Sequence, residues 1–120
     1  MKILLVEDDD FVRTLLSEQL TSENFEVVVH SNVDDAVASL TTDTFDLLIT
    51  DILMPHKDGT LLIKFSKQHK PSIPVIAITG GLENAQDDYQ HLAEMFADET
   101  LVKPIKKQEL VDLIRRLVEK

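Results

Sequence analysis

Five side chains with reactive or charged groups stand at the ends of apolar runs in this sequence. Glu7 and Asp8 follow the first run, Asp51 follows the third, Thr79 ends the fourth and Lys103 ends the fifth. If the first and third runs are neighbouring parallel strands, the three carboxylates converge, and each pair a few ångströms apart costs about 1–4 kcal/mol. A bound cation relieves that repulsion, and carboxylates without His or Cys favour a hard cation such as Mg²⁺.

The other two side chains add groups that a phosphoryl oxygen can use. Lys103 supplies a fixed positive charge, and Thr79 supplies a hydroxyl donor at the same edge of the sheet. Gly80 and Gly81 follow Thr79 and leave room for an approaching ligand. A carboxylate beside a divalent ion, a lysine and a hydroxyl is suited to phosphoryl transfer, with Asp51 as the nucleophile.

The apolar runs predict five strands that alternate with helices. Four runs are nearly continuous in Ile, Leu, Val and Phe, which is typical of strands covered on both faces of a sheet. The second run admits polar residues at Glu26 and His30, which indicates an edge strand. The predicted strands span residues 3–6, 25–30, 45–50, 73–79 and 100–103.

Between the strands, apolar residues recur at helical spacing. Ser31 and Asp34 form a capping pattern that predicts the start of the second helix, and Asp58 with Gly59 marks the start of the third. The apolar positions are Phe11, Leu15, Leu16 and Leu20; Val33, Ala36, Val37 and Leu40; Leu61, Leu62 and Phe65; Tyr89, Leu92, Ala93 and Phe96; and Leu110, Leu113, Ile114 and Leu117.

Strands that alternate with helices predict an α/β fold with a parallel sheet and helices on both faces. Five such units are too few for a closed barrel, so we expect a doubly wound open sheet in the order 2-1-3-4-5. In that fold, ligands bind beyond the carboxyl ends of the strands where the winding reverses, here between the first and third strands. The carboxylates named above stand at that point.

Length and charge narrow the function classes further. The 120 residues predict a single domain over 1–120, and 22 acidic against 12 basic side chains give a net charge of −10. That charge disfavours nucleic acid or an anionic membrane as the main partner, although residues 103–120 carry six basic and three acidic side chains. With no Cys, no spanning segment and no signal-peptide pattern, we expect a cytoplasmic protein.

Four motifs in this order and spacing resemble the receiver domain of two-component response regulators, in the superfamily of the chemotaxis receivers. The resemblance covers essentially the whole chain and implies the flavodoxin-like fold with five βα units. The motifs are Leu5-Val6-Glu7-Asp8-Asp9 with Arg13; Asp51-Ile52-Leu53-Met54-Pro55 with Asp58-Gly59; Ile78-Thr79-Gly80; and Lys103-Pro104.

The resemblance implies a phospho-acceptor in a phosphorelay rather than an enzyme acting on other substrates. Asp51 would receive a phosphoryl group from a phosphohistidine on a sensor histidine kinase or a histidine phosphotransfer protein. Asp8 would bind Mg²⁺ directly, Glu7 through a water molecule, and Leu53 through its backbone carbonyl. The domain would catalyse only its own phosphorylation and dephosphorylation.

Further roles follow from the same resemblance. Lys103, ahead of a cis peptide at Pro104, would pair with the acyl phosphate, and Thr79 would move toward the phosphoryl oxygens. That movement would change the face made by the fourth helix, fifth strand and fifth helix, which would bind a downstream protein or a second copy of the chain. The domain itself would bind neither DNA nor a membrane.

Two positions depart from the family pattern, and two other functions remain open. Thr100 stands where an aromatic switch residue is common, and Ile105 follows Pro104 where an aromatic is common. These departures favour the alternative of a degenerate receiver that binds its partner without phosphorylation. The third hypothesis is a Mg²⁺-dependent phosphatase, but such enzymes need a second Asp two residues after the nucleophile, where Leu53 stands.

Overall fold

The computed structural model describes residues 1–52, 59–80 and 96–118. Its five parallel strands form one sheet in the order β2-β1-β3-β4-β5, which confirms the predicted doubly wound fold. The strands are β1 (Lys2–Val6), β2 (Glu26–His30), β3 (Leu47–Asp51), β4 (Val75–Thr79) and β5 (Glu99–Val102). The helices are α1 (Asp10–Thr21), α2 (Val33–Thr42), α3 (Gly59–His69) and α5 (Lys107–Val118).

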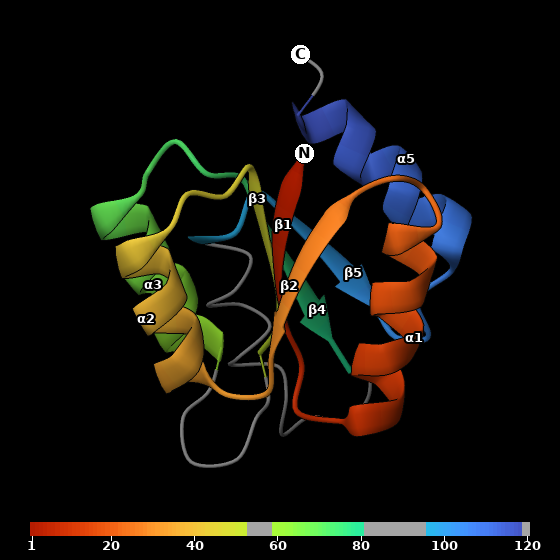
Figure 1. Ribbon diagram of the computed structural model, residues 1–120, viewed down its shortest axis with the longest axis horizontal. Helices are drawn as coiled ribbons and strands as arrows, with labels where there is room; N and C mark the ends of the chain where they lie inside the picture. Colours follow the sequence, from red (N-terminus) through yellow and green to blue (C-terminus); the bar gives the residue numbers. More distant parts are fainter. Residues whose placement is uncertain (53–58, 81–95, 119–120) are drawn as a thin grey trace.

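Helices cover the sheet from both sides, as Figure 1 shows. The helices α1 and α5 lie on one face, and α2 and α3 lie on the other. Each face buries its own apolar cluster against the sheet, because neighbouring residues of a strand point to opposite sides. The core is therefore two separate layers that share the three central strands.

The central strands are buried throughout, whereas the two outer strands are not. Every residue of β3 and β4 is buried, and so are the last four residues of β1. The polar β2 lies at one edge, as predicted. The expectation that the fifth strand is covered on both faces was wrong, because β5 forms the other edge and Val102 is 47% exposed.

The beginning of α2 differs from the predicted capping pattern. Asn32 is the N-cap, and its side-chain oxygen accepts a hydrogen bond from the backbone N–H of Asp35 at 2.8 Å. The pattern of Ser31 with Asp34 is therefore shifted by one residue. In both patterns a polar side chain accepts a hydrogen bond from the backbone N–H three residues later. Asn is as good a cap as Ser.

Three apolar residues assigned to helical stripes do not reach the core. Phe11 is 75% exposed, Leu15 is 41% exposed and Leu61 is 50% exposed, while Leu16 and Leu20 of α1 are buried. The apolar positions of α2 and α5 face the sheet as predicted. Of the stripe predicted between Tyr89 and Phe96, all residues except Phe96 lie outside the described part of the chain.

Among the described residues, no helix has the length and the apolar content that crossing a bilayer requires.

Candidate functional site

Three carboxylates meet at the carboxyl ends of β1 and β3. Glu7 and Asp8 follow β1, and Asp51 is the last residue of β3, the strand next to it. One side-chain oxygen from each of Glu7, Asp8 and Asp51 lies within 4.8 Å of the others. The convergence expected from the strand order is therefore present, and it comes from the register that pairs Val6 with Thr50.

Lys103 reaches the same point from the far side of β4. Its Nζ lies 2.9 Å from Asp51 Oδ2 and 3.4 Å from Glu7 Oε2. Its backbone N–H donates to the carbonyl of Thr79 at 2.9 Å, which ties the end of β5 to the end of β4. The peptide bond between Lys103 and Pro104 is cis, as the family resemblance implied.

Acidic side chains outnumber basic ones at this site, and the surroundings of Glu7 raise its pKa strongly. Its side chain is fully buried, and Asp51 is 3% exposed. Burial, and secondly the charge of Asp51, raise the pKa of Glu7 to about 8, although the Asp9 N–H and Lys103 act against them. Burial lowers the pKa of Lys103, but its two carboxylate neighbours outweigh burial and raise that pKa overall. Lys103 thus pairs with two of the three carboxylates, those of Glu7 and Asp51.

The residues present fit a hard divalent cation. Glu7 Oε2 is buried and has no hydrogen-bond partner among the described residues, although it lies within ion-pair distance of Lys103. Asp8 is partly exposed, which leaves the cluster open to solvent on one side. An oxygen-only donor set with carboxylates and solvent access suits Mg²⁺. Leu53, the predicted source of a backbone carbonyl ligand, lies outside the described residues.

Thr79 ends β4 and carries a buried hydroxyl. The residue is 1% exposed, and its Oγ1 has no hydrogen-bond partner among the residues that the structure describes. A buried hydroxyl without a partner costs free energy, so it is available to an acceptor that arrives later. Gly80 is described and partly exposed, whereas Gly81 lies outside the described residues.

Gly59 packs α3 directly against the end of β3. Its backbone N–H donates to the carbonyl of Ile52 at 2.8 Å. A Cβ atom added to Gly59 would lie 2.1 Å from the carbonyl oxygen of Asp51, which no side chain tolerates. Sequence reasoning used Gly59 only as a helix start and as part of a motif. Its close approach to the Asp51 backbone could not be read from spacing. Asp58 lies outside the described residues.

Arg13 is a second residue whose contacts the sequence did not reveal. It stands in the first turns of α1, and its Nη1 donates to the backbone carbonyl of Glu7 at 2.9 Å. In the sequence it was only a motif position, five residues after Asp8. The signal that could have found it is that spacing, since it brings the side chain back over the turn that follows β1.

An apolar hollow of about 520 Å³ adjoins the carboxylate cluster. It shares Lys103 with that cluster, and the exposed Phe11 and Leu15 contribute to its wall. Its full lining is Phe11, Val12, Leu15, Leu16, Gly80, Lys103, Pro104 and Ile105. The sequence placed Phe11 and Leu15 in the core and therefore did not predict this surface.

Comparisons with known proteins agree on one family. A family model described as the response regulator receiver domain matches residues 3–115. The transcriptional regulatory protein CpxR of Klebsiella pneumoniae is 38% identical over 119 residues, which cover 99% of this chain and 50% of CpxR. The response regulator protein FleR of Pseudomonas aeruginosa is 34% identical over 115 residues, 96% of this chain and 24% of FleR. The chain thus spans half or less of these relatives.

Solved structures give the same result for the fold. The response regulator TrrA of Thermotoga maritima, solved in complex with Mg²⁺ and BeF, has a TM-score of 0.85 and 28% identity, with 97% of each chain covered. A receiver domain of a sensor histidine kinase from Pseudomonas aeruginosa, with magnesium coordinated in its active-site cleft, has a TM-score of 0.88 and 26% identity. That match covers 99% of this chain and 98% of the other.

Proposed function

This chain belongs to the response regulator receiver domain family, and on that premise we propose that Asp51 accepts a phosphoryl group in a Mg²⁺-dependent reaction. The observation that carries the proposal is the arrangement around Asp51. Its nearly buried carboxylate lies 2.9 Å from Lys103 and within 4.8 Å of the acid pair. Those are the groups that a carboxylate nucleophile and an incoming phosphoryl group require.

In the proposed reaction, an Asp51 oxygen attacks the phosphorus of a phosphohistidine. The new O–P bond forms as the P–N bond breaks, and the electron pair of that bond leaves with the imidazole nitrogen. Lys103 then pairs with a phosphoryl oxygen instead of the Asp51 carboxylate, and the hydroxyl of Thr79, which has no partner among the described residues, donates to another. The donor's imidazole takes up a proton from solvent after it leaves.

The acid pair would hold the metal ion. Asp8 is partly exposed and reaches solvent, so we assign it the direct contact, with Asp51 as the second carboxylate ligand. The buried Glu7 would act through a water molecule, and Leu53 would add its carbonyl as the family resemblance implies. When bound, Mg²⁺ supplies positive charge that offsets the negative charge of the phosphoryl oxygens. The metal-containing receivers named above support this assignment.

The phosphoryl donor would be a protein, either a sensor histidine kinase or a histidine phosphotransfer protein. The support is the apolar hollow beside Lys103, where Phe11 is 75% exposed. A small phosphate donor has few apolar groups to bury on such a surface. A helix that carries a phosphohistidine can bury apolar side chains there. The donor would then approach Asp51 with its position already fixed.

The output would be a change in protein binding in the cytoplasm. Phosphorylation at Asp51 would alter the face that includes β5, α5 and the predicted fourth helix, whose residues lie mostly outside the described part of the chain. That face would take a downstream protein or a second copy of the chain. The relatives named transcriptional regulators are about twice as long as this chain, and we assign no DNA contact to the domain itself.

Intact-protein mass spectrometry tests the proposal. Incubation with acetyl phosphate and Mg²⁺ should add one phosphoryl group, and the addition should be absent in Asp51→Asn or in excess EDTA. Asp112→Asn on the exposed side of α5 is the matched control and should be modified normally. No mass increase with several donors would refute the proposal. A partner that binds equally well to wild type and Asp51→Ala would favour the degenerate receiver instead.

A further inference from the structure

We propose that Arg13 is a positioning residue for the metal site: it holds the turn after β1 in the shape that presents Glu7 and Asp8 to Mg²⁺. It acts through the backbone carbonyl of Glu7 and does not touch the metal or the phosphoryl group. The inference rests on the proposed function only in presuming that Mg²⁺ binds at the acid pair.

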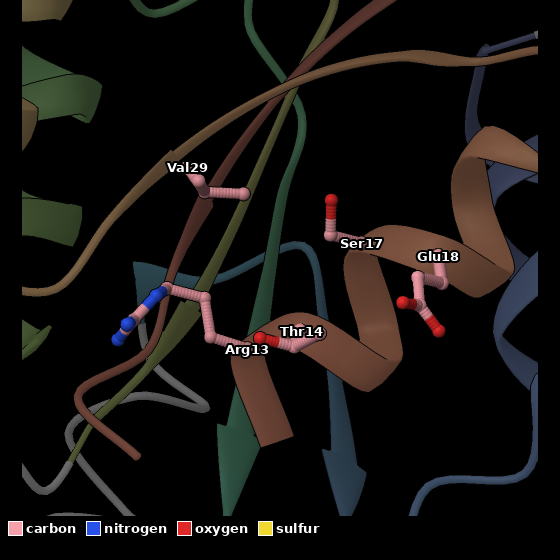
Figure 2. A pocket seen from close by; sticks show the side chains of 5 residues that line it. All are labelled: Arg13, Thr14, Ser17, Glu18 and Val29. Carbon is pink, nitrogen blue, oxygen red and sulfur yellow. The ribbon is translucent and has the colours of Figure 1, made fainter. Parts of the chain in front are cut away.

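The side chain of Arg13 is committed to this turn. Nη1 donates to the carbonyl of Glu7 at 2.9 Å, and Nη2 pairs with the carboxylate of Asp10. Figure 2 shows the guanidinium extending from α1 across to the end of β1, below Val29, while Ser17 and Glu18 lie farther along the helix. The guanidinium thus links α1 to the peptide group that leads from Glu7 into Asp8.

Other contacts fix the neighbouring atoms of the same turn. The N–H of Glu7 donates to the carbonyl of His30 at 3.1 Å, and the N–H of Asp9 donates to Glu7 Oε1 at 3.1 Å. Asp9 in turn caps α1 by accepting from the N–H of Val12 at 3.0 Å. The Arg13 contact completes this set, because it orients the Glu7–Asp8 peptide plane. That plane determines the direction in which the Asp8 side chain leaves the backbone.

The two contacts of the guanidinium contribute unequally to holding the turn after β1. The Asp10 side chain is 90% exposed, and an ion pair with such a group contributes little in water. The Arg13 side chain is only 20% exposed, and its other acceptor is a backbone carbonyl at the edge of the buried site. The contact with Glu7 therefore carries the positioning role. A lysine carries its charge on a flexible stem without the planar guanidinium, so it holds the Glu7 carbonyl in a less fixed direction.

A Mg²⁺ titration followed by amide chemical shifts tests this role without requiring phosphorylation. Loss of a residue that orients metal ligands typically weakens metal binding 10- to 100-fold. Arg13→Met, which keeps the alkyl stem, should therefore weaken Mg²⁺ binding about tenfold or more. Arg13→Lys should fall between wild type and Arg13→Met. The controls are Asp10→Asn, which removes only the ion pair, and Arg116→Met on the exposed side of α5. Both should stay within about twofold of wild type.

The outcomes separate the inference from its premise. If wild type binds no Mg²⁺, the proposed function fails and the inference with it. If wild type binds and Arg13→Met binds within about twofold of it, the inference alone is wrong. An equal loss in Asp10→Asn and Arg13→Met would also overturn it, because the ion pair would then be the cause. Should Arg13→Met not fold, Arg13→Lys decides, and binding unchanged from wild type overturns the inference.

Discussion

Glu7 is an acidic residue whose side chain the fold removes from water. It is fully buried beside Asp51, and burial is the main cause that raises its pKa to about 8. Below that pH the metal-free protein keeps a proton on Glu7, whereas binding of Mg²⁺ favours the ionised carboxylate. Proton and metal therefore compete.

The affinity for Mg²⁺ should consequently rise with pH up to about 8 and then level off. The slope should approach about tenfold per pH unit if one proton is released. Calorimetry in buffers of different ionisation enthalpy measures both the affinity and the proton release. The Mg²⁺ affinity of Glu7→Gln should lack this dependence on pH. An identical pH dependence in wild type and Glu7→Gln would contradict the assignment of the released proton to Glu7.

Two buried threonines at the ends of adjacent strands should respond in opposite ways to loss of the hydroxyl. Thr50 is fully buried and its Oγ1 donates to the carbonyl of Asp51 at 2.9 Å, while Thr79 Oγ1 has no partner among the described residues. Thr50→Val should lower the free energy of unfolding by about 1 kcal/mol. Thr79→Val should leave the unphosphorylated protein equally stable or more stable. Urea unfolding measures both, and an equal loss in Thr79→Val would show that its hydroxyl is already satisfied.

The residues that bring a charged side chain to the acid cluster were predictable, whereas contacts made with backbone atoms were not. Glu7, Asp8, Asp51 and Lys103 follow from one rule, that ligands gather beyond the carboxyl ends of parallel strands. Gly59, by contrast, lets α3 pack against the end of β3 because it has no Cβ atom. The five-residue spacing from Asp8 places Arg13 over the turn after β1, but the acceptor of its guanidinium is a backbone carbonyl, which the residue pattern does not mark.

At the scale of elements, the packing of α3 against β3 is the contact most sensitive to a small change. A Cβ at Gly59 would lie 2.1 Å from the Asp51 carbonyl and 2.8 Å from the Ile52 Cα, both of them backbone atoms that cannot move alone. Gly59→Ala should therefore lower the free energy of unfolding by about 1–3 kcal/mol.

The same substitution should weaken Mg²⁺ binding, because α3 can relieve the contact only by displacing the strand end that carries Asp51. Ser66→Ala in the middle of α3 is the control. Its hydroxyl is buried without a partner among the described residues, so this variant should be at least as stable as wild type and bind Mg²⁺ normally. A Gly59→Ala protein with wild-type stability and Mg²⁺ affinity would show that the helix moves freely against the sheet.

The order of the strands and helices was predicted better than the burial of single residues within them. Alternation of apolar runs with helical stripes gave the strand order, since few topologies satisfy right-handed crossovers. The surroundings of single residues depend on what packs nearby. Phe25, Phe45 and Ile73 are buried just before β2, β3 and β4, so burial extended the predicted strands beyond their hydrogen-bonded residues. Phe11 has the apolar character of a core residue, yet it points away from the sheet.

For the whole molecule, the acid cluster couples stability to metal binding. In the folded protein, Asp8 and Asp51 lie close together beside a Glu7 that keeps its proton below about pH 8, and the two carboxylates separate when the chain unfolds. A metal ion that binds only the folded state stabilises it, by about 1.4 kcal/mol at a free concentration ten times the dissociation constant. We therefore expect the thermal unfolding midpoint to rise with Mg²⁺ and to fall back on addition of EDTA.

Asp8→Asn separates the two effects, because it removes one repelling charge and one metal ligand together. Without Mg²⁺ this variant should be more stable than wild type by about 1 kcal/mol. With Mg²⁺ its unfolding midpoint should not change. Asp112→Asn on the exposed side of α5 should match wild type in both conditions. A wild-type midpoint that does not respond to Mg²⁺ would argue against a metal site in the acid cluster.

The most direct test of the central claim is to locate the phosphoryl group on the chain. The protein is phosphorylated with acetyl phosphate and Mg²⁺ and then reduced with borohydride, which converts a phosphorylated aspartate to homoserine, and peptides are sequenced by mass spectrometry. We expect homoserine at position 51 in wild type and at no position in Asp51→Asn. Homoserine at another acidic residue, such as Asp8, or none in wild type, would contradict the assignment of Asp51 as the phospho-acceptor.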